Sequence, residues 1–326
     1  MVDQAMGERV GERVARPELS VALVNWTGTP PDDWRYVVDR ARAAEDAGFD
    51  RVVVSDHVVF GEDLEAYGKP ELGGMIGGRQ PTGPDGCWLE PLTSLSVIAG
   101  ATTRVRLATG ILLAALRRPA VLAKAAATLD VLSGGRVDLG VGIGWQREEY
   151  EAAGLDFGAR GRLLDHTLDV CQRLWRETRA SYDADGLTFD GIHMMPKPIA
   201  AGGVPIWVSG TLNERVVGRL ARFGAGWIPW GADLVDLAVA IPRMRDGVAA
   251  LGRDPGEIGV VGSLVVVPDE HGAVDAEATM APVPDLVAIG VTDVRLFMAL
   301  PESPAELADT FGRLVQAFRT HVPART

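Results

Sequence analysis

The sequence predicts a (β/α)8 barrel with insertion regions. Short β-branched runs alternate with longer helical patterns along the 326 residues, and eight such pairs can be counted. Parallel strands need crossover helices, so this alternation indicates a parallel sheet, and eight units are enough to close it. A barrel of this kind takes about 250 residues. The runner-up is an open doubly wound sheet with a second domain, but no linker or composition shift marks a domain boundary.

Four strand–helix pairs are expected in the first part of the chain. The run RVVVS is the pattern of a strand buried on both faces. Gly48 ends the helix before it, and Pro119 begins a helix that closes at Ser133-Gly134-Gly135. The strands are expected at Leu19–Val24, Arg51–Ser55, Val105–Thr109 and Val137–Gly142, and the helices at Asp32–Ala47, Pro91–Ala99, Pro119–Leu132 and Arg160–Arg176.

The second part supplies four more pairs. Its strands are expected at Ile206–Ser209, Gly226–Ile228, Ile258–Val267 and Val294–Phe297, and its helices at Asn213–Arg222, Leu234–Leu251, Pro284–Ile289 and Ala305–His321. Two irregular stretches interrupt the alternation. Val58–Leu89 is rich in glycine and is expected to act as a lid or wall, and Glu177–Gly203 carries turn signals of a small hairpin. We expect a flexible tail over 1–18 and one barrel domain over 19–326.

Composition excludes several classes of function. Acidic residues outnumber basic ones, 44 to 32, which argues against a nucleic-acid binder. Cys87 and Cys171 lie far apart, which excludes a disulfide scaffold and fits a reducing compartment. No two histidines have metal-binding spacing, and no apolar run is long enough for a membrane. We therefore expect a cytoplasmic protein without a metal, a membrane anchor or a nucleic-acid partner.

In a barrel, function lies at the carboxyl ends of the strands. His57 follows a buried strand there and is the best acid–base candidate, although a structural histidine is an equally good reading. Gly140, Gly142 and Gly144 form a GxGxG pattern that fits a dinucleotide fingerprint poorly. These glycines either let a flat ring lie against the backbone or simply fill a narrow barrel.

Two further groups occupy the same end. Ser209, Gly210 and Thr211 precede a helix, whose N–H groups and dipole favour a phosphate cradle. An ordinary helix cap by Thr211 or Asn213 is the alternative, and the two are compatible. Tryptophans at strand ends are expected in part to line a pocket for a flat cofactor or an apolar substrate. They are Trp26, Trp88, Trp145, Trp227 and Trp230.

These residues belong to longer segments that resemble the luciferase-like monooxygenase superfamily, and within it the branch that uses the deazaflavin coenzyme F420. The most specific is LSGGRVDLGVGIGW, which identifies the family better than the substrate. The matching segments are AEDAGFDRVVVSDH (Ala44–His57), EPLTSLSVIAGATTRVRLATGILL (Glu90–Leu113), RRPAVLAKAAATLDVLSGGRVDLGVGIGW (Arg117–Trp145), PIWVSG (Pro205–Gly210) and GAGWIPW (Gly224–Trp230).

The resemblance implies a barrel with the cofactor ring at the rim and a homodimer. A non-prolyl cis peptide maps to Gly110–Ile111, beneath the ring. Asp56 maps to a contact with the polar edge of the ring, and His57 to a histidine near the reactive carbon in the sugar-phosphate dehydrogenase branch. Ser209, Gly210 and Thr211 map to the phosphate site. Cofactor binding is thus expected at Asp56, Gly110, Ile111, Gly142, Gly144, Ser209, Gly210 and Thr211, catalysis at His57, and a substrate pocket at Trp26 and Trp145.

Two departures argue against a sugar phosphate as substrate. Gly61 stands where that branch has tryptophan, and Trp145 stands where it has a catalytic glutamate. The expected activity is hydride transfer between F420 and an organic substrate, with the protein supplying orientation and a proton. An FMN-dependent monooxygenase using oxygen and a non-catalytic flavin- or metabolite-binding barrel are the alternatives.

Overall fold

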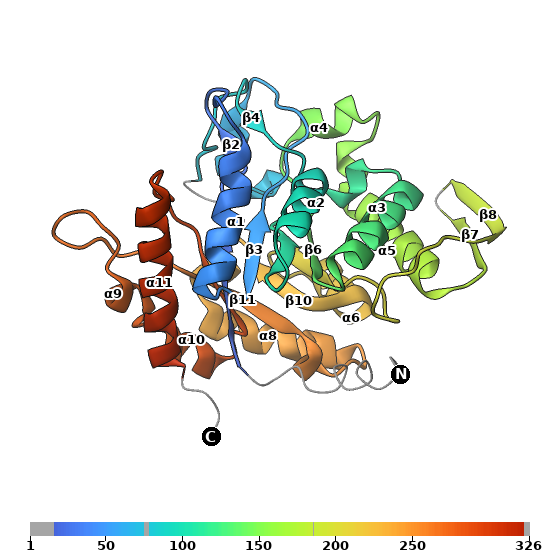
Figure 1. Ribbon diagram of the computed structural model, residues 1–326. Coiled ribbons are helices and arrows are strands. Elements are labelled where there is room, and N and C mark those ends of the chain that lie inside the picture. The colour runs from blue at the N-terminus through green and yellow to red at the C-terminus, as the bar shows by residue number, and fades with distance from the viewer. Residues whose placement is uncertain (1–15, 75–77, 185, 323–326) are drawn as a thin grey trace, which may run out of the picture.

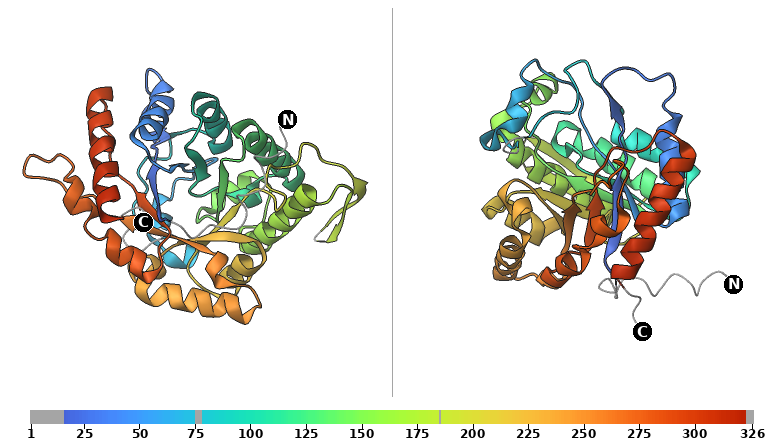
Figure 2. Two further views of the ribbon diagram at one scale, coloured as in Figure 1. Left: turned by 60° about the horizontal axis from the view of Figure 1, so that its bottom comes forward. Right: turned by 90° about the vertical axis from the view of Figure 1, so that its left-hand side faces the viewer.

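The computed structural model describes residues 16–74, 78–184 and 186–322. Eight parallel strands close into a barrel in the order β1-β12-β11-β10-β9-β6-β5-β3, and helices surround it (Figures 1 and 2). The expected (β/α)8 barrel is confirmed. The strands are β1 Glu18–Ala22, β3 Arg51–Val54, β5 Arg106–Thr109, β6 Val137–Val141, β9 Ile206–Gly210, β10 Gly224–Pro229, β11 Gly259–Leu264 and β12 Asp293–Leu296.

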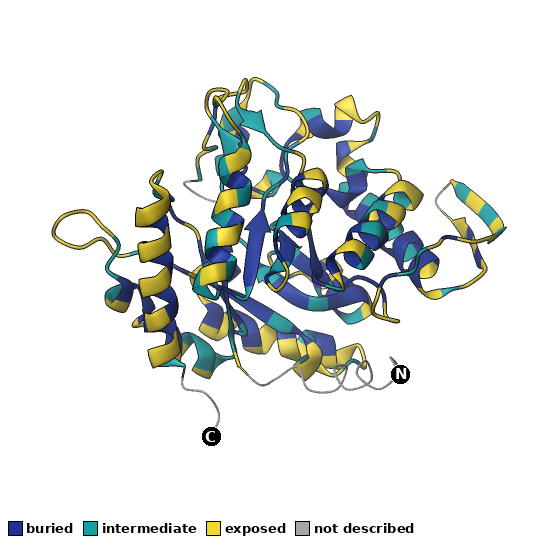
Figure 3. Cartoon of the chain, viewed as in Figure 1, coloured by how far each residue is buried: buried dark blue, intermediate teal, exposed yellow. Residues whose placement is uncertain are grey.

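The eight principal helices also lie where the sequence placed them, with one division and small shifts at the ends. These helices turn buried residues toward the barrel and exposed residues outward (Figure 3). Gly134 ends α3 in the left-handed region at φ 69°, which glycine adopts without a side-chain clash. The helices are α1 Arg35–Ala47, α2 Pro91–Ala101, α3 Pro119–Ser133, α5 Arg160–Arg176, α6 Glu214–Phe223, α8 Leu237–Ala250, α10 Val283–Ile289 and α11 Pro304–His321.

The helix expected over 234–251 is wrong as one piece. It consists of α7, Ala232–Val235, and α8, and Asp236 divides them because its side chain caps Val239 N at 3.2 Å. Two short helices, α4 Arg147–Ala152 and α9 Ala276–Met280, were not predicted. Each has fewer than two turns, which is too short for a periodic pattern to be visible.

The irregular stretches carry small sheets. β7, Ala180–Ala184, and β8, Leu187–Ile192, form the expected hairpin, which projects beyond α5 in Figure 1. The stretch 58–89 contains the short 3-10 helices η1, Leu64–Gly68, and η2, Pro70–Leu72. It ends in β4, Cys87–Trp88, which pairs antiparallel with β2, Trp26–Thr27. Of the expected tail 1–18, residues 1–15 lie outside the described residues, and Glu18 already belongs to β1.

Charged side chains fill the amino-terminal end of the barrel interior. Arg51 binds Asp138 at 3.0 Å and Asp293 at 2.6 Å, and Arg295 binds Asp293 at 2.9 Å. Burial acts to raise the pKa of Asp293, but Arg51 and Arg295 more than offset it and lower this pKa. These buried charges compensate one another, so ion pairs fill the amino-terminal end of the barrel interior.

In the described ranges, every helix is too short or too polar to cross a bilayer.

Candidate active site

The expected residues of the second, third and fourth strand ends lie side by side at the carboxyl rim. Gly110 N donates to Val54 O at 2.8 Å, and Leu112 N donates to Gly140 O at 2.7 Å. The peptide bond Gly110–Ile111 is cis, as the resemblance implied. A Cβ added at Gly142 would lie 2.9 Å from the Ile111 side chain, so the backbone of Gly142 approaches that residue closely.

Toward the carboxyl ends of the strands, part of the barrel interior is accessible to solvent. Ser263 on β11 pairs in register with Arg295 on β12, whose guanidinium reaches Ser20 on β1 at 3.2 Å. Ser263 therefore faces the same interior side, yet it is exposed. Val265 and Phe297, two residues further along, are 84 % and 60 % exposed. Together Ser263, Val265 and Phe297 present an exposed, largely apolar surface at the mouth, which sequence reasoning did not find.

Asp56 is buried and engaged by protein groups. Its Oδ2 accepts from Leu113 N at 2.8 Å and from Arg117 at 2.6 Å, and its Oδ1 accepts from Arg117 at 3.1 Å. Arg117 also binds Glu90 at 2.8 Å. Asp56 thus holds the segment that follows the cis peptide in place. This structural role was not predicted from the sequence, which indicated a contact with the ring edge.

His57 is held by a carboxylate that the sequence did not reveal. Its Nδ1 lies 3.2 Å from Oε1 of Glu149, and the same Oε1 accepts from Val58 N at 2.8 Å. The Glu149 side chain is 0 % exposed and that of His57 is 12 % exposed. The second oxygen of Glu149, Oε2, is buried without a partner among the described residues. Glu149 comes from the unpredicted α4, which explains why it was missed.

Aromatic rings enclose His57. The centroids of Phe60, Trp88 and Trp145 lie 4.6, 4.8 and 5.8 Å from that of the imidazole. Trp26 stacks on Trp88 at 5.4 Å, so the structure brings both expected pocket tryptophans, Trp26 and Trp145, to the surroundings of His57. The result is an apolar wall around one titratable pair.

The stretch 58–89 is tied to the strand ends beside it. The Gln146 side chain accepts from Gly61 N at 3.1 Å and donates to Val59 O at 2.7 Å. Trp230, after β10, donates through its indole N–H to Gly73 O at 3.0 Å. The described part of this stretch is therefore attached beside both β6 and β10, as a wall of the site would be.

The Ser209–Thr211 turn is partly occupied by the protein itself. Asn213 caps α6 by accepting from Arg215 N at 3.0 Å and from Val216 N at 3.1 Å. Asp233 accepts from Leu212 N at 2.5 Å. The helix cap expected as an alternative is present through Asn213, and the N–H groups of Leu212, Arg215 and Val216 are occupied by protein oxygens.

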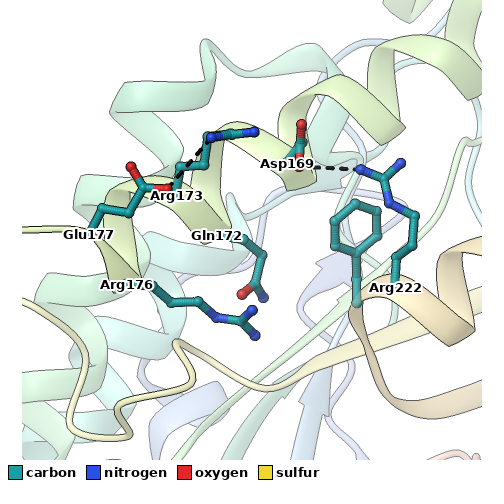
Figure 4. A pocket seen from close by; sticks show the side chains of 7 residues that line it. Asp169, Gln172, Arg173, Arg176, Glu177 and Arg222 are labelled. Atoms are coloured by element: carbon teal, nitrogen blue, oxygen red, sulfur yellow. Dashed lines mark hydrogen bonds and ion pairs between the residues drawn. The ribbon is translucent and has the colours of Figure 1, made fainter. Parts of the chain in front are cut away.

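A surface pocket lies elsewhere, between α5 and α6. Its volume is about 320 Å³, and Figure 4 shows two arginines in it paired with acids, Arg173 with Glu177 and Arg222 with Asp169. These pairs neutralise most of its charge, and the pocket lies away from the strand ends that carry His57. No cluster of three potential metal ligands occurs within the described ranges.

A family model described as luciferase-like monooxygenase matches residues 19–290. The chain belongs to the luciferase-like monooxygenase family. An uncharacterized protein of Mycobacterium tuberculosis is 32 % identical over 278 residues, which are 83 % of this chain and 89 % of that protein. A protein of Segniliparus rotundus named F420-dependent glucose-6-phosphate dehydrogenase is 33 % identical over 233 residues, 69 % of this chain and 62 % of that one.

Solved structures share the fold of this luciferase-like protein. One is an F420-dependent secondary alcohol dehydrogenase in complex with an F420–acetone adduct, with a TM-score of 0.73 and 19 % identity. The match covers 93 % of this chain and 99 % of that one. At this identity the likeness concerns the architecture alone.

Proposed function

We propose that this luciferase-like protein is an oxidoreductase that transfers a hydride between coenzyme F420 and an organic substrate at the carboxyl rim. The relative from Segniliparus rotundus and the structurally similar alcohol dehydrogenase are both named for F420. The observation that carries the proposal is the arrangement at the mouth. His57 lies at the third position after β3, and the neighbouring β5 leads into the Gly110–Ile111 backbone.

The residues at the mouth fit a flat ring. A Cβ at Gly110 would lie 2.5 Å from a Val53 methyl, so the side chain is absent where the backbone approaches β3. Val265 and Phe297, which follow β11 and β12, expose apolar side chains at the same carboxyl end of the barrel. A ring that covers these apolar side chains would lower the free energy by about 25 cal/mol per Å² of apolar surface removed from water.

The remaining cofactor contacts follow from the same assignment. Ile111, Gly142 and Gly144 would form the backbone surface under the ring, and Asp56 would hold that surface in place through Leu113 and Arg117. Gly210 and the exposed Thr211, with Ser209 before them, would receive the phosphate through their N–H groups.

F420 supplies the hydride chemistry when bound. His57 moves the proton that accompanies the hydride, because an imidazole can act as an acid or a base and this one lies at the rim. The rings of Phe60, Trp88 and Trp145 exclude water from the imidazole on the faces that they cover.

The substrate that fits this wall is apolar and bulky. Trp26 and Trp145 offer ring surface, and Gly61 and Trp145 occupy the two positions at which the sequence departs from the sugar-phosphate branch. We therefore assign the site to an uncharged organic substrate rather than to a sugar phosphate.

We also assign the protein to the cytoplasm, which its two free cysteines favour.

Titration with oxidised F420 and with FMN tests the cofactor assignment. We expect F420 to bind more tightly than FMN. Quenching of tryptophan fluorescence should report the binding, because Trp145 and Trp26 border the site. Tighter binding of FMN would transfer the assignment to the monooxygenase alternative. Tight binding of F420 without turnover across alcohols, ketones and enones would favour a carrier protein instead.

Single-turnover hydride transfer tests the role of His57. His57→Ala should slow the transfer by about 100-fold, the usual contribution of a positioned acid or base. His271→Ala is the matched control, because His271 is exposed on the surface. Equal rates in His57→Ala and the native protein at every pH would remove His57 from the mechanism.

A further inference from the structure

The carboxylate of Glu149 is an unusual group to bury. Its side chain is 0 % exposed, and burial of an isolated carboxylate is unfavourable unless a partner compensates it. Within ion-pair distance, the described residues provide His57 and no lysine or arginine. The other hydrogen bond to this side chain comes from Val58 N, which donates to Oε1. Oε2 is buried and has no hydrogen-bond partner among the described residues.

The contact decides which imidazole nitrogen carries the proton. Oε1 of Glu149 already accepts from Val58 N, so the Nδ1 of His57 that lies 3.2 Å from the same oxygen is the donor. In the neutral imidazole, Nε2 then has a free lone pair. Among the described residues, no hydrogen bond to Nε2 is present, and Phe60, Trp88 and Trp145 restrict rotation of the ring.

We propose that Glu149 is the positioning residue of the reaction: it fixes His57 as the Nδ1–H tautomer and directs Nε2 to the proton that accompanies the hydride. This inference rests on the proposed function of His57. Trp145 stands where the sugar-phosphate branch has a catalytic glutamate. Four residues later, on α4, Glu149 supplies a carboxylate that acts through the imidazole of His57. The logic is that of a carboxylate orienting a catalytic histidine.

Nitrogen-15 NMR of the imidazoles, recorded on the protein without cofactor, tests the tautomer directly. The resonances of His57 are assigned by their loss in His57→Gln. We expect a protonated Nδ1 and an unprotonated Nε2 in the native protein. Glu149→Gln should keep this pattern, since the amide oxygen can still accept, and Glu149→Leu should shift it toward a mixture. Protonation of Nε2 in the native protein would overturn the inference without any variant.

Kinetics then separate positioning from mere support of the fold. Glu149→Leu should lower kcat by about 10- to 100-fold, the usual effect of losing an orienting partner, with KM changed by less than about twofold. Glu149→Gln should recover most of the loss. Glu151→Leu, on the same helix α4 but exposed, is the matched control and should behave as the native protein.

The two proposals fail differently. If His57→Ala is slow but Glu149→Leu is as fast as Glu151→Leu, His57 remains in the mechanism and the positioning role is refuted. If His57→Ala is as fast as the native protein, the proposed function of His57 fails, and with it the catalytic meaning of the contact, whatever tautomer the NMR spectrum shows.

Discussion

Asp56 and Arg117 form an ion pair at the end of β3 that links three segments of the rim. The carboxylate is 0 % exposed, and its oxygens accept from Arg117 and from Leu113 N. Burial acts to lower the pKa of Arg117, but hydrogen bonding and charge from Asp56 and Glu90 raise it. Arg117 therefore stays charged and depends on its partner.

Asp56→Ala should lower the free energy of unfolding by about 3 kcal/mol, because it leaves a buried guanidinium with fewer partners. Urea denaturation monitored by circular dichroism measures this. Asp39→Ala is the control, because Asp39 forms an exposed pair with Arg42 and should cost less than about 1 kcal/mol. Equal losses in the two variants would refute the structural role of Asp56.

Gly140 shows that the glycines of the GxGxG pattern serve different purposes. A Cβ added there would lie 2.0 Å from the backbone oxygen of Thr109, whereas at Gly142 it would meet only a movable Ile111 side chain at 2.9 Å. The first glycine is needed for the contact between β5 and β6, and the second faces the proposed ring site. The close approach at Gly140 fits the reading that small residues fill a narrow barrel, and the reading that a ring lies against the backbone stays a prediction for Gly142.

Gly140→Ala should destabilise the protein by about 3 kcal/mol or prevent folding, because two strands would have to separate. Gly218→Ala in α6 is the matched control: nothing lies within 4 Å of the added Cβ, and alanine stabilises a helix interior by about 0.5–1 kcal/mol. Thermal unfolding of both variants checks this, and a Gly140→Ala protein with native stability would contradict the clash.

At the scale of elements, Glu45 connects α1 with the start of β5. Its carboxylate accepts from the backbone N–H groups of Thr103, Arg104 and Val105 at 2.9, 2.6 and 2.9 Å. Burial acts to raise the pKa of Glu45, but these N–H groups lower it below its usual 4.5. Because the pKa is lower in the folded state, the stabilisation is present above pH 4.5 and is lost as the pH falls through the folded pKa.

Glu45→Gln should therefore reduce stability at neutral pH and weaken the loss of stability below about pH 4.5. Urea denaturation at several pH values between 3 and 7 measures both effects. Glu270→Gln is the control, since Glu270 is exposed and should leave the pH profile unchanged. A Glu45→Gln profile parallel to that of the native protein would show that these hydrogen bonds do not favour the ionised form.

At the scale of the whole molecule, two of the outer helices expose large apolar side chains. α2 and α3 pack side by side, and they expose Val97, Val121 and Leu132 at 58, 67 and 74 %. Several large apolar side chains exposed on adjacent helices are typical of an interaction surface. We expect the homodimer that the family resemblance implies to use this face.

Light scattering after size-exclusion chromatography should give twice the mass of the chain, 34.7 kDa. Val121→Asp with Leu132→Asp should yield a monomer, because dimerisation would bury two charges. Val235→Asp is the control, since Val235 is equally exposed but lies on α7. A monomeric native protein would reject the dimer, and a dimeric double variant would place the interface elsewhere.

The barrel, its eight strands, the hairpin after α5 and the family could be predicted from the amino-acid sequence, because they depend on periodicity, turn residues and contiguous motifs. The positions of His57 and Gly110–Ile111 at the rim could also be predicted, since the end of a strand is a local property. The contact of Glu149 with His57, the ion pair of Asp56 with Arg117 and the exposure of Val265 and Phe297 became visible in the folded chain alone. Those contacts join residues far apart in the chain, and closure of the barrel, rather than any local pattern, brings them together.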